Sequence, residues 1–223
     1  MLLILHRVLD HDTLSTVRHL LDDAYFMDGR LSAGMAARRV KRNEELRPDR
    51  EVIERLNDLV MNRLVRHPEY RSAAMPLRVA APYYARYTEG MTYGDHTDDP
   101  IMMADEPYRS DIAITVFLSE PAEYEGGELE IRTAFGRQTV KLPAGDAVMY
   151  PASSVHRVAP VTRGVRLVAV TWVQSAIRDP ARREILYELN QAREALLRES
   201  PESDVAVKIN HAYVNLVRMW AEL

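Results

Sequence analysis

The sequence contains no cysteine, which excludes disulfides and thiolate metal sites. Any bound metal would need histidine, carboxylate or carbonyl ligands. A chain without cysteine also suits a reducing compartment, and we expect the protein in the cytoplasm. The sequence also lacks a Gly-rich phosphate loop and a serine nucleophile motif, so neither nucleotide binding nor serine-dependent hydrolysis is predicted.

The chain has no excess of positive charge. Its net charge is −4 and its pI is near 6.0. Because no global basic surface is available to neutralise phosphates, nucleic acid is not an expected partner. The run Arg38-Arg39-Val40-Lys41-Arg42 is a local basic cluster, which we interpret as a solvated loop or strand edge.

Long apolar runs are also absent. The N-terminal run Met1-Leu2-Leu3-Ile4-Leu5 is too short for the apolar core of a secretion signal and has no basic flank. No stretch approaches the ~20 apolar residues that a membrane span needs. We therefore expect no membrane partner. The sequence leaves open whether the chain forms a homo-oligomer.

The patterns that are present divide the chain into three zones. Residues 1–76 read as a mainly helical region packed on the core, with one helix after Asp10 and another after Pro48. Residues 77–176 change to short β-branched and aromatic runs separated by Gly and Pro. Residues 177–223 return to helical spacing, with a second helix expected from Pro201. The fold class is predicted as α+β, with a sandwich or barrel-like double sheet between flanking helices.

The most informative residues are two histidines and an aspartate. His96 and Asp98 are two residues apart, so on a strand their side chains would point to the same face. His156 lies at the start of another predicted strand. Two imidazoles and one carboxylate on one side of a metal form the facial triad of non-haem Fe(II) oxygenases, which leaves positions open for oxygen and a chelating co-substrate. Alone, His-x-Asp also suits a surface or hydrogen-bonded pair.

Arg166 is the candidate that completes the site, because a buried arginine can grip a carboxylate with two hydrogen bonds. A tight turn at Arg163-Gly164 would point Arg166 away from His156. Pro160 disfavours that pairing, since proline interrupts a strand ladder. A loop over residues 160–164 would pair Val158 with Arg166, placing it on the face of His156 and roughly 7 Å along the strand. A five-carbon dicarboxylate could bridge that gap.

Longer strings resemble the bacterial PKHD-type hydroxylases, relatives of the prolyl and lysyl hydroxylases of which some are linked to iron uptake. The resemblance covers nearly the whole chain, including Val40-Lys41-Arg42-Asn43 and the C-terminal helices. Its strings are Ile114-Thr115-Val116-Phe117-Leu118-Ser119-Glu120-Pro121, Tyr124-Glu125-Gly126-Gly127-Glu128-Leu129, Leu142-Pro143-Ala144-Gly145-Asp146, Tyr150-Pro151-Ala152-Ser153-Ser154-Val155-His156-Arg157-Val158, Pro160-Val161-Thr162-Arg163-Gly164-Val165-Arg166 and Trp172-Val173-Gln174-Ser175. The flanking acids Asp95 and Asp99 stand where we expect mostly Asn in this family.

The resemblance implies a double-stranded β-helix (jelly-roll) core, iron on His96, Asp98 and His156, and 2-oxoglutarate as co-substrate on Arg166. It implies O2-dependent hydroxylation with release of succinate and CO2, and names ascorbate as a candidate reductant. A tyrosine before the His-x-Asp motif is also implied to contact the co-substrate. Tyr87 is the best match, with Tyr83, Tyr84 and Tyr93 as rivals.

Several interpretations stay open at this stage. The substrate could be a small molecule, an amino acid or a peptidyl group such as proline or lysine, because family does not fix substrate. The protein could instead be a cupin-like metalloenzyme without a keto acid, a non-catalytic sensor of iron or 2-oxoglutarate, or a purely structural jelly roll. We interpret Trp172 as a packing residue, and Asp99 and Asp105 as loop carboxylates near the mouth of the site.

Overall fold

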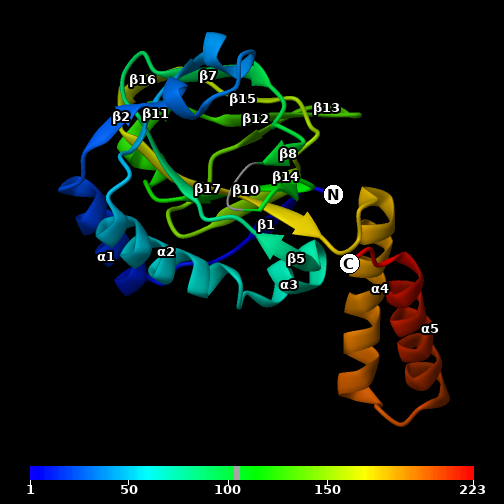
Figure 1. Ribbon diagram of the computed structural model, residues 1–223. Helices are drawn as coiled ribbons and strands as arrows, with labels where there is room; N and C mark the ends of the chain where they lie inside the picture. Colours follow the sequence, from blue (N-terminus) through cyan, green and yellow to red (C-terminus); the bar gives the residue numbers. More distant parts are fainter. Residues whose placement is uncertain (103–105) are drawn as a thin grey trace.

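The computed structural model describes residues 1–102 and 106–223. Two antiparallel sheets enclose the centre of the molecule, three helices cover the larger sheet, and two further helices form a projecting hairpin (Figure 1). The helices are α1 (His11–Asp22), α2 (Arg50–Leu64), α3 (Pro68–Ala74), α4 (Pro180–Glu199) and α5 (Asp204–Trp220), with 3₁₀ turns η1 (Gly29–Ser32), η2 (Ala37–Arg39) and η3 (Pro121–Glu123).

The larger sheet has the order β1-β14-β10-β17-β6-β4-β2, and β5 also pairs with β17. Its central strand β10 is buried along its whole length, which explains the continuous apolar run of that segment. The strands are β1 (Leu3–Leu5), β2 (Phe26–Asp28), β4 (Glu44–Leu46), β5 (Pro76–Val79), β6 (Tyr83–Tyr87), β10 (Ile112–Phe117), β14 (Ala147–Pro151) and β17 (Arg166–Ser175).

The smaller sheet has the order β13-β12-β15-β7-β3, and two separate strand pairs, β11–β16 and β8–β9, lie outside both sheets. The strands are β3 (Lys41–Arg42), β7 (Thr92–His96), β12 (Leu129–Thr133), β13 (Gly136–Val140), β15 (His156–Val158), β11 (Tyr124–Gly126), β16 (Val161–Gly164), β8 (Ile101–Met102) and β9 (Tyr108–Arg109). This arrangement agrees with the predicted jelly-roll core between helices.

Two hydrophobic cores follow from this layering. One lies between the larger sheet and helices α1–α3, and the other lies between the two sheets. Strand β17 serves both cores through its alternating side chains: Ala169 and Val173 face the helices, whereas Val168 faces the smaller sheet. The inner core is incomplete on one side, and the polar pocket described below occupies that space.

The first two helices begin where capping chemistry places them. Asp10 accepts a hydrogen bond from the backbone N–H of Thr13 at 2.8 Å, which confirms the start predicted for α1. Asp49 caps α2 in the same way, one residue after Pro48. The buried face of α2 consists of Leu56, Val60 and Leu64.

One prediction about the strands is incomplete, and another is wrong. The segment predicted to be mainly helical also supplies β1 to β4, because short edge strands of two or three residues are too brief to show a two-residue alternation. The predicted pairing of Val158 with Arg166 does not form. Residues 161–164 make strand β16, which pairs with β11, and the chain then crosses to the larger sheet, where Arg166 pairs with Tyr87.

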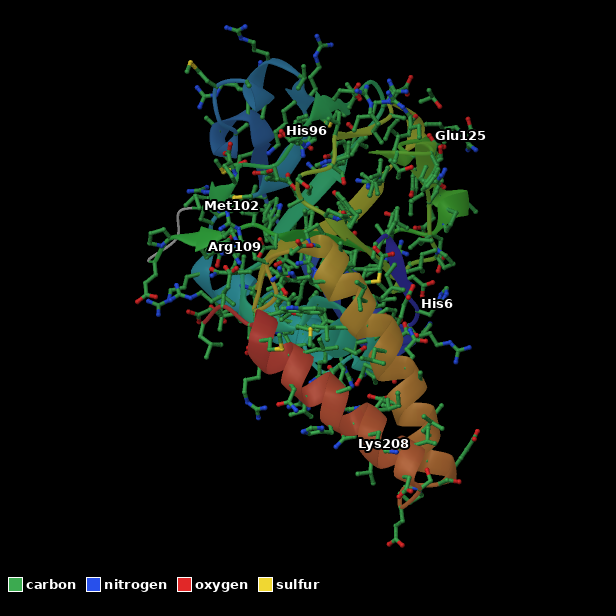
Figure 2. All side chains as sticks on the ribbon, turned by 90° about the vertical axis from the view of Figure 1, so that its right-hand side faces the viewer. His6, His96, Met102, Arg109, Glu125 and Lys208 are labelled. Carbon is green, nitrogen blue, oxygen red and sulfur yellow. The ribbon has the colours of Figure 1, made fainter. Side chains whose placement is uncertain are left out.

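The C-terminal hairpin projects from the sheets, with Lys208 at the far end and His96 at the opposite end of the molecule (Figure 2). Helix α4 begins at Pro180 after the cap residue Asp179. Helix α5 begins at Asp204 rather than at Pro201, because Ser203 provides its cap. Among the described residues, none of the helices is both long enough and apolar enough to cross a membrane.

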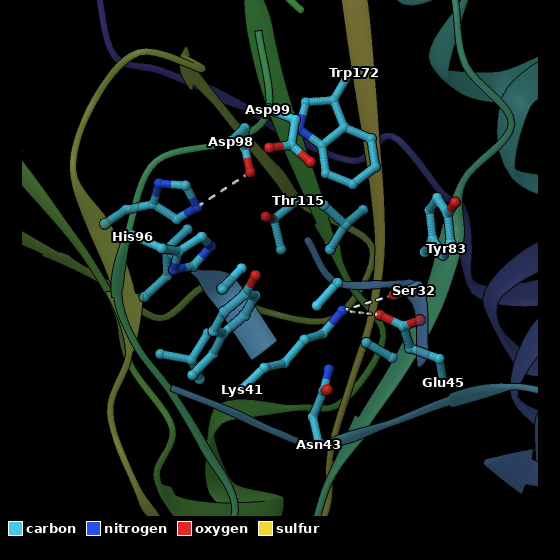
Figure 3. Close-up of a pocket in the computed structure, with 18 of the residues that line it drawn as sticks. Ser32, Lys41, Asn43, Glu45, Tyr83, His96, Asp98, Asp99, Thr115 and Trp172 are labelled. Carbon is cyan, nitrogen blue, oxygen red and sulfur yellow. Dashed lines mark hydrogen bonds and ion pairs between the residues drawn. The ribbon is translucent and has the colours of Figure 1, made fainter. Parts of the chain in front are cut away.

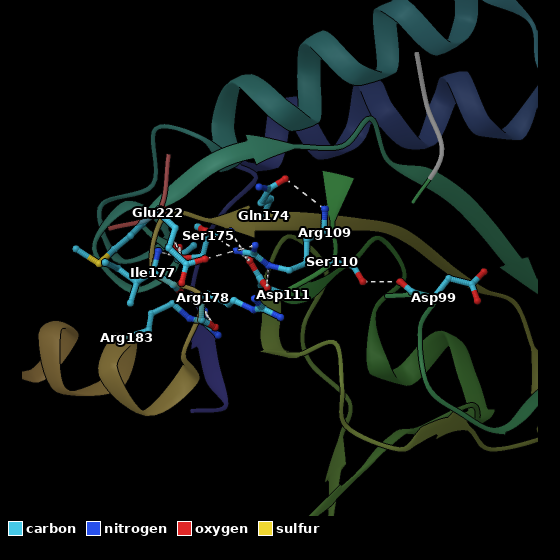
Figure 4. A network of polar contacts seen from close by, with 12 residues as sticks. Asp99, Arg109, Ser110, Asp111, Gln174, Ser175, Ile177, Arg178, Arg183 and Glu222 are labelled. Atoms are coloured by element: carbon cyan, nitrogen blue, oxygen red, sulfur yellow. Dashed lines mark hydrogen bonds and ion pairs between the residues drawn. The ribbon is translucent and has the colours of Figure 1, made fainter. Parts of the chain in front are cut away.

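A polar network fixes the base of this hairpin (Figure 4). Asp111 accepts hydrogen bonds from the Arg109 guanidinium at 2.7 and 3.0 Å and from the Ser175 backbone N–H at 2.9 Å. The buried Arg183 donates to the carbonyl oxygen of Ile177 at 2.7 Å. Glu222 lies 3.8 Å from Arg109. The last strand, the helix pair and the end of the chain are thereby joined at one place.

Candidate active site

His96 and His156 meet because their strands are neighbours. Strands β7 and β15 pair so that His156 lies opposite His96, and the two rings are 4.2 Å apart between centroids. Asp98 lies two residues beyond the end of β7, and its Oδ1 is 3.8 Å from His156 Nε2. One ligand atom from each of the three residues lies within 4.8 Å of the others. The predicted convergence of these side chains is confirmed, although Asp98 belongs to a loop.

Backbone carbonyls orient both imidazoles. His96 Nδ1 is 2.8 Å from the carbonyl oxygen of Gly94, and His156 Nδ1 is 3.0 Å from that of Ser154. A carbonyl only accepts, so each Nδ1 carries the proton and each Nε2 keeps its lone pair for a metal. The Tyr93 ring stacks on His96 at 3.6 Å with an angle of 11° and restricts that imidazole further.

The electrostatics of the cluster suit a cation. Burial, reinforced by the neighbouring His156, lowers the pKa of His96 to about 3, so this imidazole is neutral as a metal ligand must be. Burial raises the pKa of Asp98, whose Oδ2 has no hydrogen-bond partner. Two imidazole nitrogens beside a buried carboxylate form a donor set that fits Fe(II). Within residues 1–102 and 106–223, this is the one such group of histidines and acids.

Arg166 enters the same cavity from the opposite sheet. It is the first residue of β17, it is 1% exposed, and its Nε has no hydrogen-bond partner. Its guanidinium carbon lies 5.0 Å from the centre of the Tyr87 ring and 5.6 Å from that of Phe117. No carboxylate of the described residues forms an ion pair with it. A buried guanidinium without an anion fits a carboxylate supplied by a ligand.

The four candidate tyrosines take different places. Tyr87 is buried beside Arg166, and burial raises its pKa to about 12. Tyr83 and Tyr93 also line the cavity. Tyr84 points to the other side of the sheet, into the core under the helices, and its hydroxyl donates to Asn57 at 3.1 Å. The geometry therefore separates Tyr84 from the site.

Sequence reasoning missed several lining residues. Thr115 and Tyr150 face the cavity, and Trp172, interpreted above as a packing residue, lines it with an indole Nε1 that has no partner. The two-residue alternation of β17 would have found Trp172, because Arg166, Val170 and Trp172 share one face. Asp99 lines the mouth as expected, whereas Asp105 lies outside the described residues.

The cavity continues past the triad to the N-terminal strands (Figure 3). There it is lined by Ser32, Lys41, Asn43 and Glu45. The Arg38–Arg42 run was interpreted as a solvated loop or strand edge, and its last two residues form the edge strand β3 of the smaller sheet. Arg38, Arg39 and Arg42 are exposed, but Lys41 turns inward and is 7% exposed.

Comparisons with known proteins agree with this geometry. Residues 82–174 match the model of the 2OG-Fe(II) oxygenase superfamily, and residues 180–222 match that of the PKHD-type hydroxylase C-terminal domain. A PKHD-type hydroxylase of Thioalkalivibrio sulfidiphilus is 52% identical over 224 residues, covering 100% of both chains. One from Nitrobacter winogradskyi is 42% identical over 225 residues, again covering 100% of both chains.

Solved structures show the same fold at low sequence identity. A prolyl-4-hydroxylase from Pseudomonas putida is 17% identical with a TM-score of 0.53, covering 78% of this chain and 92% of that one. HygX from Streptomyces hygroscopicus, solved with nickel and 2-oxoglutarate, is 16% identical with a TM-score of 0.51, covering 76% and 81%.

Proposed function

Because the chain belongs to the PKHD-type hydroxylases of the 2OG-Fe(II) oxygenase superfamily, and is thus an Fe(II)- and 2-oxoglutarate-dependent dioxygenase, we propose that His96, Asp98 and His156 hold its iron. The observation that carries this assignment is the grouping of three ligand atoms, two from carbonyl-oriented imidazoles and one from a buried carboxylate, within 4.8 Å. The three donor atoms would occupy one side of the iron and would leave the positions that face the cavity free for other ligands.

Arg166 is proposed to bind the far carboxylate of 2-oxoglutarate, with Tyr87 contacting the co-substrate beside it. The buried guanidinium supports this role, since no carboxylate among residues 1–102 and 106–223 forms an ion pair with it. Among the described residues the buried hydroxyl of Tyr124 has no hydrogen-bond partner, and burial raises its pKa although the nearby Arg166 charge opposes that shift. These polar groups would be satisfied together by one anionic ligand.

The iron supplies the oxidative chemistry when it is bound, and the chain supplies the geometry. His96 and His156 keep neutral nitrogens toward the metal because their Nδ1 protons are donated to carbonyls. Asp98 balances the metal charge from a buried position. The apolar side chains of the inner core, such as Leu129 and Val158, keep water away from the co-substrate end of the cavity.

We propose an amino-acid-like or peptidyl group as the substrate to be hydroxylated, with succinate and CO2 as the other products. One structural neighbour supports a peptidyl group. It is a prolyl hydroxylase from Trichoplax adhaerens that was solved in complex with a peptide fragment of hypoxia inducible factor. Ascorbate is kept as the proposed reductant, to be tested by its effect on the number of turnovers.

The assignment of the metal ligands is tested by metal content and succinate formation. Asp98→Ala and His96→Ala should each lose stoichiometric Fe(II) and succinate production, because removal of one of three ligands leaves an incomplete donor set. Asp95→Ala is the matched control. Asp95 lies three residues before Asp98 in the sequence, and it pairs with Arg132 and Arg137 on the surface. Full turnover in Asp98→Ala would overturn the assignment. A hydroxylated product would distinguish a hydroxylase from a non-catalytic sensor, whereas succinate formation alone separates the two poorly.

A further inference from the structure

A buried ion pair lies beside the Tyr93 ring, which stacks on His96 and stands between the pair and that imidazole. Lys41 Nζ is 2.5 Å from Glu45 Oε1 and 2.9 Å from Ser32 Oγ, and the two charged side chains are only 8% and 12% exposed. Figure 3 shows this cluster across the cavity from His96 and Asp98. The proposed binding of iron and 2-oxoglutarate gives these residues no role.

Such a pair is a weak source of stability. Removal of two charges from water costs free energy that their attraction often fails to offset, and apolar replacements of similar volume are frequently as stable. Lys41 and Glu45 come from the short strands β3 and β4, where exposed side chains would be the ordinary choice. The burial of this ion pair beside a cavity is therefore better explained by ligand binding than by a contribution to the stability of the fold.

Asn43 adds an independent observation. It is 5% exposed, it lines the same cavity, and its Oδ1 has no hydrogen-bond partner in the part of the chain that the structure describes. Figure 3 shows its carboxamide ending below the Lys41 side chain and pointing toward it. A Cβ at Gly29 would lie 2.0 Å from Asn43 Oδ1, so the absence of a side chain at Gly29 allows this carboxamide its position.

Two contrasting walls connect this cluster with the iron site. Tyr83 and Trp172 form an aromatic wall, with their rings in edge contact at 5.8 Å. Ala33, Gly34 and Ala37 line the cavity with small side chains. A flat or slender group could therefore lie between the triad and the cluster without displacing a large side chain.

We propose that Lys41, Asn43 and Glu45, with Ser32, form a subsite that binds an uncharged amide group of the substrate. This inference rests on the proposed function, because the bound molecule is the one presented to the iron. The cluster has no net charge and offers donors and acceptors side by side, which matches the C=O and N–H of an amide. A ligand with a single charge would attract one member of the pair and leave the other unpaired in a buried position.

The test uses three probes with one carbon skeleton: hexanamide, hexanoate and hexylammonium. Protein loaded with Zn(II) and 2-oxoglutarate is titrated with each probe, and binding is followed by saturation-transfer NMR. Hexanamide should bind about tenfold or more tightly than either charged probe. Failure of the protein to retain Zn(II) and 2-oxoglutarate before any probe is added would instead count against the proposed function.

A double variant separates recognition from folding. Lys41→Met with Glu45→Leu should keep the fold and the bound 2-oxoglutarate but lose the preference for hexanamide. The control is Arg50→Met with Glu54→Leu, which removes an exposed ion pair of α2 and should leave the preference unchanged. The proposal is overturned if a charged probe binds as tightly as the amide, if none of the probes binds at millimolar concentration, or if the preference survives in the Lys41/Glu45 variant.

Discussion

Arg166 is the residue whose role depends most on its surroundings. Its guanidinium is buried against Tyr87 and Phe117 and has no acidic partner among the described residues. A buried cation of this kind is tolerated when an anion pairs with it. The planar guanidinium can bind a carboxylate through two parallel hydrogen bonds. Lysine at this position would keep the charge but lose the paired geometry.

Arg166→Lys should therefore weaken 2-oxoglutarate binding and leave the metal site intact. Loss of one charge-assisted hydrogen bond corresponds to about 10- to 100-fold in the co-substrate concentration needed for half-maximal succinate formation. Metal stoichiometry should be unchanged. Arg163→Lys is the control, because Arg163 is an exposed residue of β16 that pairs with the exposed Glu125 of β11. An equal effect in both variants would contradict the assignment of Arg166.

Single residues also show where sequence reasoning reached the site and where it stopped. The spacing of His96 and Asp98 identified the right pair, but the strand ends at His96 and Asp98 reaches the site from the following loop, where strand alternation does not apply. Lys41, Asn43 and Glu45 have the same alternation, but Lys41 and Glu45 lie in strands of only two and three residues, with Asn43 between the strands, and no local pattern identifies them. Only tertiary contacts place them in the cavity.

At the scale of elements, the crossing between the sheets decides the geometry of the site. The sequence predicted His156 and Arg166 on one hairpin, whereas the structure places them on opposite sheets with β16 between them. Both arrangements direct the two side chains to one cavity. The error arose because Pro160 disfavours one local pairing but does not reveal which other strand pairs with residues 161–164. That strand is β11, which is distant in the sequence.

The junction between β17 and the C-terminal hairpin should be sensitive to one hydroxyl. Ser175 Oγ donates to the carbonyl oxygen of Ala74 at 2.7 Å and accepts from the Ile177 N–H at 3.1 Å, and the residue is fully buried. Ser175→Ala leaves both groups unpaired and should lower the free energy of unfolding by about 1–3 kcal/mol in urea titration. Ser72→Ala, an exposed hydroxyl on α3, should change it by less than about 0.5 kcal/mol. Equal values would contradict this account of the junction.

The outer face of the smaller sheet should give a measurable pH dependence of stability. Hydrogen bonds from Arg157, and then from Arg137, hold the pKa of Glu130 below its ordinary value of 4.5. Because the folded state depresses this pKa, the stabilisation is complete above pH 4.5 and is lost as the pH falls through the folded value. Glu130→Gln should thus be less stable than the parent at pH 6, with the difference shrinking toward pH 3. A difference independent of pH would contradict the role of this carboxylate.

The whole molecule combines a rigid β-sandwich with an open polar interior. Its two sheets each contribute one half of the site: the smaller provides His96 and His156, and the larger provides Arg166 and Tyr87. The α4–α5 hairpin lies at the other end of the molecule (Figure 2), so the chemistry is expected to depend on the sheets alone. The fold class, the convergence of His96, Asp98 and His156, and the position of Arg166 in the same cavity agree with the expectations from the sequence. The second polar end of the cavity was not predicted, because it depends on how the N-terminal strands close over the sheets.

The most direct test of the account is an anaerobic titration of the protein with Fe(II) and 2-oxoglutarate, recorded in the visible spectrum. A keto acid that chelates iron gives a weak charge-transfer band, and the account predicts this band only when both components are present. It should disappear in His156→Ala and, at the same co-substrate concentration, in Arg166→Ala. Iron that binds without any band would contradict the central claim and favour a metalloenzyme that uses no keto acid.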